Sequence, residues 1–229
     1  MLTKLTDQDG KTRAGLPTET QWGENITHKA TGDPIILCTN RAIHWYADET
    51  LAVLFNPIHA RIPHPIGWEV VVQGETVQGT TKCGSHQVTT IRRIPLPKFT
   101  TNQRIAFGII AVMQLTDQPR EFIVWADKWL SAEDRLPKAA AMATDAGYWA
   151  AGATNATVAG CWAAKAAYGA AYAAGWMVYA ADAAAKAADA AAKAAYAAAC
   201  AADWAVYAAD LDDIIQTLIL CALAAKEIR

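Results

Sequence analysis

The sequence predicts an α+β protein: a small strand-containing N-terminal domain followed by an alanine-rich helical bundle or oligomerisation arm. Three observations support this prediction. Short β-branched runs separated by turn residues fill the first hundred positions, helix patterns with capping residues follow, and alanine makes up about half of the segment from Ala139 to Asp210. We therefore expect a β-rich domain over residues 1–100, connecting helices over 101–137 and an alanine-rich helical region over 138–229.

The first half of the N-terminal domain mixes turn signals with short apolar runs. Residues 1–34 are rich in threonine, glycine, aspartate and proline, which predicts turns around a short strand or two, with Trp22 as an anchor. The run IILC at 35–38 predicts a strand. The run DETLAVLF at 48–55 has an acidic start and an apolar face, so it predicts a short helix that the following Asn-Pro pair should stop.

The second half of this domain is dominated by β-branched residues. From Trp68 to Ile94 the chain alternates such residues with glycines at 74, 79 and 84, which predicts a three-stranded meander. The connecting region then predicts two helices. Thr100 or Thr101 can cap a helix running from about Asn102 to Leu115, and a second helix is expected from Pro119 to Leu130.

The alanine-rich region has a seven-residue periodicity. Large or charged residues recur at this interval at Tyr172, Tyr179, Lys186, Lys193, Cys200 and Tyr207. Because alanine favours helix but buries little area, such helices gain stability by close approach to one another, within the chain or between chains. The pattern predicts a bundle or an oligomerisation arm, and the alternative is a ligand groove lined by the stripe. A final amphipathic helix is expected after Leu211–Asp213.

Composition excludes several classes of partner. The net charge is −2 and no basic patch is visible, so we expect no nucleic-acid partner. No stretch has the leucine, isoleucine and valine content of a membrane-spanning helix, so we expect no membrane partner. The five widely spaced cysteines form no CxxC pair and read as reduced thiols, and no signal peptide is recognisable. Together these features predict a cytoplasmic protein.

The densest group of polar and aromatic residues lies in the middle of the N-terminal domain. Aromatic faces suit a base, arginine suits phosphate, and histidine can bind either or transfer protons. The candidate ligand-binding residues are Arg41, His44, Trp45, Tyr46, Asn56, His59 and Arg61, with His64 beside them. The alternative is structural, with hydrogen-bonded histidines and Trp45 in the core. Histidine spacing matches no metal template, so we expect no metal ligands, and no motif for a cofactor is present.

Two family resemblances carry functional expectations. The segment from Ile35 to Ile94, with RAIHWYADETLAVLFNPIHA and TTKCGSHQVTTIRRIPLP, resembles an uncharacterised domain of phage and prophage proteins that often precedes alanine-rich helices. That resemblance implies a mobile-element origin, where small proteins frequently counter host defence. The shorter segment AIHWYADETLA is similar to a strand-to-helix segment of ADP-ribosyltransferase folds, which implies a pocket for NAD or an ADP-ribose-like molecule.

These expectations combine into a leading functional hypothesis with two alternatives. The leading hypothesis is a non-enzymatic, oligomeric phage-type accessory protein that sequesters a nucleotide-like, ADP-ribose-type signal of host defence. The first alternative is an ADP-ribosyltransferase-like or nucleotide-processing enzyme that uses His44, Tyr46 and either Glu69 or Glu75. The second is a scaffold or an inhibitor of a host protein, working through its helical region.

Overall fold

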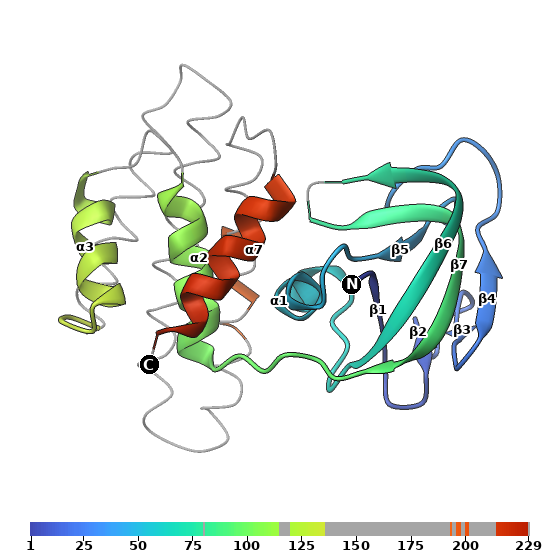
Figure 1. Cartoon of the computed structure of the whole chain (residues 1–229), viewed down its shortest axis with the longest axis horizontal. Coiled ribbons are helices and arrows are strands. Elements are labelled where there is room, and N and C mark those ends of the chain that lie inside the picture. The colour runs from blue at the N-terminus through green and yellow to red at the C-terminus, as the bar shows by residue number, and fades with distance from the viewer. Residues whose placement is uncertain are drawn as a thin grey trace. The chain divides into compact units, whose positions relative to one another are not determined.

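The computed structural model describes residues 1–79, 81–114, 120–135, 193, 196, 197, 200, 201 and 214–228. Its described elements confirm the α+β class, with an antiparallel sheet in the N-terminal part and helices after it (Figure 1). The chain divides into two compact units, Met1–Lys98 and Phe99–Arg229. The predicted alanine-rich bundle falls almost wholly outside the described residues and stays a prediction.

The first unit is built on a five-stranded antiparallel sheet. Its strands are β1 (Thr3–Thr6), β4 (Ile26–Lys29), β5 (Ile43–Trp45), β6 (Ile66–Gln78) and β7 (Cys83–Ile94). The order is β1-β6-β7-β4, and β5 also pairs with β7. Two hydrogen bonds of 2.8 Å join Thr3 to Tyr46, the residue after β5, so β1 contacts both β6 and the end of β5. The strands therefore close into a ring around a shared core.

That core is formed by the inward side chains of the sheet and by one helix. Trp45 and Trp68 are buried, and the Trp68 Nε1–H donates to the Thr6 hydroxyl at 2.9 Å. Helix α1 (Glu49–His59) buries a continuous run from Thr50 to Phe55. The Asp48 carboxylate caps this helix by accepting from two backbone N–H groups, as the acidic start of the run predicted.

The predicted end of this helix is wrong by one turn. We expected the Asn56-Pro57 pair to stop it, but the helix continues through Pro57 to His59. The end of the helix is closed by Asn56. Its backbone carbonyl accepts from Ala60 and Arg61, and its side chain bonds both backbone groups of Ile62.

The predicted strand at 35–38 is also wrong, because this segment forms a turn. Cys38 has a φ of +64°, and the Thr31 N–H donates to the Asn40 carbonyl at 3.2 Å, so the chain doubles back. The apolar side chains are still used for packing. Ile35 is buried, and the methyl groups of Leu37 lie so close to Gly84 that a Cβ there would meet one at 2.7 Å.

The predicted three-stranded meander is a two-stranded hairpin of long strands, β6 and β7, which curve side by side (Figure 1). Of the three expected glycine turns, only the one near Gly79 connects strands. Gly74 has a φ of +78° and lies where the register shifts between Gln73 and Thr76, so it bends β6 rather than ending it. Gly84 lies inside β7 and leaves space for Leu37.

In the second unit the described helices are α2 (Thr101–Met113), α3 (Arg120–Leu130) and α7 (Ile214–Lys226). Thr100 and Gln103 form a capping box at the start of α2, which confirms the predicted cap. Helix α7 packs beside α2 (Figure 1), and the Gln103 side chain donates to the Lys226 carbonyl at 2.9 Å. Among the described helices, none combines the length and apolar character needed to cross a membrane.

Candidate functional site

His44 is the most electrostatically distinctive of the predicted ligand-binding residues. It lies on β5, and its Nε2 accepts a hydrogen bond from the Cys38 backbone N–H at 2.9 Å, which places the ring proton on Nδ1. Burial, together with the positive charges of Lys82, Lys4 and Arg13, lowers the pKa of His44 to about 4. The imidazole is therefore neutral at physiological pH and is surrounded by cationic side chains.

Tyr46 and His59 are brought together by β5 and α1. The Tyr46 hydroxyl lies 3.1 Å from His59 Nδ1, and the Thr81 hydroxyl lies 3.3 Å from His59 Nε2. The His59 ring also stacks on Phe55, with 5.7 Å between ring centroids. Burial lowers the pKa of His59 to about 3, with Lys82 and His44 adding to the effect, and burial raises the pKa of Tyr46. Tyr46, His59 and Thr81 are therefore all neutral at pH 7.

Trp45 and Asn56 have structural partners. The buried Trp45 Nε1–H donates to the Ser85 hydroxyl at 2.7 Å, and Thr76 bonds the same hydroxyl at 3.0 Å. The Asn56 amide holds the loop after α1 through Ile62, as described above. Both residues therefore support the geometry around His44 and His59 rather than facing solvent.

The predicted basic residues lie at the margin of this region. Arg41 is half-buried, and its guanidinium donates to the Asp33 carbonyl at 3.4 Å. Arg61 and His64 are exposed residues of the loop after α1, and both have a positive φ. The His64 carbonyl accepts a hydrogen bond from the Gln8 side chain. Of the predicted cluster, the structure thus joins Tyr46 to His59 directly. Arg41 lies in the loop before β5, and Arg61 and His64 lie in the loop after α1.

Lys4 is a residue of this region that the sequence did not single out. It lies on β1 and is only 7% exposed. Its Nζ donates to the His44 carbonyl at 3.1 Å and lies 4.4 Å from the centroid of the Trp22 ring. Burial, together with the positive charge of Arg13, lowers the pKa of Lys4 to about 7. A single lysine between threonine and leucine gives no local signal of burial, because the closure of β1 against β5 creates it.

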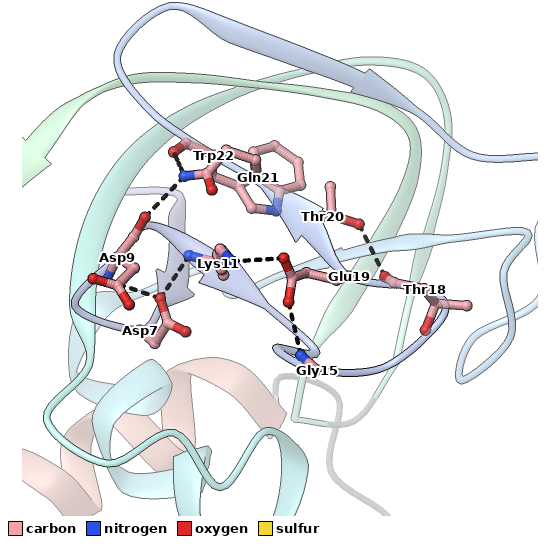
Figure 2. Close-up of polar contacts among 9 residues, drawn as sticks. All are labelled: Asp7, Asp9, Lys11, Gly15, Thr18, Glu19, Thr20, Gln21 and Trp22. Carbon is pink, nitrogen blue, oxygen red and sulfur yellow. Dashed lines mark hydrogen bonds and ion pairs between the residues drawn. The ribbon is translucent and has the colours of Figure 1, made fainter.

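A polar hairpin presents Trp22 and Arg13 beside Lys4. It consists of β2 (Lys11–Thr12) and β3 (Thr20–Gln21), and Figure 2 shows its polar contacts. Lys11 pairs with Glu19 at 2.7 Å, and Glu19 also accepts from the Gly15 N–H, so the pKa of Lys11 is raised and that of Glu19 lowered. This ion pair is neutral as a unit, and its role is to hold the hairpin.

The histidines do not converge on a metal site within the described part of the chain. No group of three histidine, cysteine or acidic residues there could hold an ion. His86 Nδ1 instead lies 3.7 Å from the Asp33 carboxylate. Comparisons with protein-family models, curated proteins and solved structures gave no match, so both family resemblances stay expectations.

Proposed function

We propose that this chain is a binding protein, not an enzyme, and that its ligand is a small anionic molecule of the nucleotide type. The observation that supports this proposal is the charge around His44. The ionisable groups that act on its imidazole are Lys82, Lys4 and Arg13, and all three are basic. Because like charges repel, an anion that binds among them relieves this repulsion.

We assign the ligand contacts to three accessible side chains, Arg13, His44 and Lys82, which we call the cationic rim. Trp45 and Tyr46 are buried and bonded within the fold, so their rings are not the expected contact surface. Arg13 is exposed, while His44 and Lys82 are half-buried, so these side chains can reach a phosphate group. Phosphate recognition by charge is therefore the primary interaction, and base recognition is secondary.

The biological role follows from the resemblance to phage proteins. A protein that binds a phosphate-bearing signal tightly and does not turn it over would remove the signal from the host cell. An ADP-ribose-type molecule, with two linked phosphates, fits the cationic rim. We propose sequestration of such a signal, in an oligomeric assembly, as the counter-defence activity.

Catalysis has weaker support from the same contacts. The two ring nitrogens of His59 contact the hydroxyls of Tyr46 and Thr81. Neither hydroxyl carries a negative charge that could stabilise an imidazolium. The low pKa of His59, about 3, also makes it a poor general base. Glu69, an alternative carboxylate base, is paired with Arg92 at 2.6 Å.

Isothermal titration calorimetry with ADP-ribose tests the proposal, with inorganic pyrophosphate and adenosine as the phosphate-only and phosphate-free probes. We expect ADP-ribose and pyrophosphate to bind and adenosine not to bind. Lys82→Glu should weaken ADP-ribose binding at least about tenfold, because a charge-assisted hydrogen bond contributes ~1.5 to 3 kcal/mol. Lys29→Glu makes the same charge change at an exposed position of β4 and should have little effect.

Two results would count against this function. If folded protein released no heat with any of the three probes, the anion-binding proposal would be wrong. If Lys82→Glu and Lys29→Glu weakened binding equally, the ligand would be responding to total charge and not to the His44 region. Native mass spectrometry of the same samples reports the subunit number and any retained ligand.

A further inference from the structure

The turn before β5 is tied to that strand through the side chain of His44. The Cys38 backbone N–H donates to His44 Nε2 at 2.9 Å. A backbone N–H can only donate, so this ring nitrogen must accept, and the bond exists only while Nε2 carries no proton. Among the described residues, the other hydrogen bonds at positions 36–39 close the turn on itself, as from the Thr39 hydroxyl to the Ile36 carbonyl at 2.8 Å. The bond to His44 is therefore the polar link between the turn and the sheet.

Two features of the turn depend on this link. Cys38 has a φ of +64°, a left-handed conformation that is unfavourable for a residue with a side chain and that surrounding contacts must hold. The preceding residue, Leu37, lies against the β6–β7 hairpin, where a Cβ on Gly79 or Gly84 would lie within 2.8 Å of its methyl groups. Without the bond to His44, backbone strain at Cys38 favours movement of the turn away from the hairpin.

The side chains around His44 determine when the link can break. Lys82 in the β6–β7 turn, Lys4 on β1 and Arg13 in the loop between β2 and β3 all oppose a positive charge on its ring. His59, at the end of α1, interacts with the same ring, so a positive charge on either histidine disfavours a charge on the other. His44 therefore stays neutral, and the turn stays tied, until the pH falls below the ordinary histidine range.

We propose that the bond between His44 and Cys38 is an acid-sensitive switch, and that a proton on His44 Nε2 releases the turn at residues 36–39 from the β6–β7 hairpin. In this step Nε2 takes a proton from solvent and changes from acceptor to donor, so two donors then face each other. The half-buried ring becomes an imidazolium among basic side chains and turns toward solvent. Leu37 leaves the hairpin, and acidification exposes an apolar side chain. This inference depends on the geometry of the turn, and not on the proposed nucleotide-type ligand.

Solution NMR of the full chain tests the switch as the pH is lowered from 7 to 3.5. The nuclear Overhauser contact between the Leu37 methyl groups and the Gly84 Hα reports whether the turn is closed, and the ring 15N shifts of His44 report its protonation. We expect the contact to be lost with the midpoint of the His44 titration, and the Cys38 amide proton to shift with it. The amide resonances of β6 and β7 away from the turn should keep their folded positions over this transition.

Two variants separate His44 from the neighbouring histidine. In His44→Gln the side-chain carbonyl can accept from the Cys38 N–H but does not titrate, so the contact between Leu37 and Gly84 should persist at low pH. His59→Gln leaves the switch in place, so the contact should still be lost. The proposal is overturned if the contact persists in the native chain at pH 3.5, or if His44→Gln loses it at the same pH as the native chain. Loss of the contact only together with the folded signals of β6 and β7 would also overturn it, because that result is unfolding and not release of one turn.

Discussion

Acidification should destabilise the first unit through His44 and His59, because both histidines are held neutral in the folded protein. Their pKa values fall from 6.5 to about 4 and about 3, mainly through burial. The unfolded chain therefore takes up two protons near pH 6.5 that the folded chain does not. The free energy of unfolding is therefore greatest above pH 6.5. It decreases as the pH falls from 6.5 to ~4 through His44, and from 6.5 to ~3 through His59.

The size of this effect follows from proton linkage. Between pH 6 and pH 5 almost two extra protons bind to the unfolded chain, which corresponds to a fall of up to ~2.7 kcal/mol per pH unit. Both imidazoles are half-buried, so solvent screening reduces the expected fall to ~1 to 2 kcal/mol per pH unit. A loss of this size is a large part of the total stability of a small domain.

Hydrogen exchange measured at several pH values would test this prediction unit by unit. The amides of β6 and β7 report opening of the first unit, and their protection, corrected for the intrinsic pH dependence of exchange, should decrease from pH 7 to pH 5. His59→Gln should flatten this dependence by the contribution of one proton. A corrected protection that stays constant from pH 7 to pH 5 would refute the reasoning.

Three further predictions concern packing and capping, and urea unfolding monitored by tryptophan fluorescence measures the first two. Lys4→Met should stabilise the protein at pH 7 by roughly 4 kcal/mol, since it removes an amine whose pKa falls from 10.5 to about 7. This penalty grows as the pH falls from 10.5 to 7 and is constant at lower pH, and a loss of stability in Lys4→Met would contradict the prediction. Gly84→Ala should destabilise by about 1 to 3 kcal/mol, because its Cβ would lie 2.7 Å from a Leu37 methyl group, and less in a Leu37→Ala background. Thr100→Ala should lower the protection of the first-turn amides of α2 by about 1 kcal/mol, and unchanged protection would show that the capping box contributes little.

Local chemistry explains which elements could be predicted from the sequence. The Asp48 cap and the Thr100 capping box are each encoded within four residues, so the starts of α1 and α2 were predicted correctly. The candidate site was predicted in part for a similar reason. His44 lies on the short strand β5, Tyr46 directly follows it, and His59 lies at the end of the helix that comes next, so a compact supersecondary unit brings Tyr46 and His59 together.

The errors arise where tertiary contacts outweigh local preference. An apolar run of four residues at 35–38 suits a strand, yet its side chains pack equally well from a turn when Gly84 leaves space for Leu37. The glycines of the hairpin were interpreted as turns because glycine is favoured both in turns and at β-bulges, so the sequence does not distinguish the two. Lys4 illustrates the limit most clearly. Its burial depends on contacts with Trp22 and His44, which are 18 and 40 positions away in the sequence.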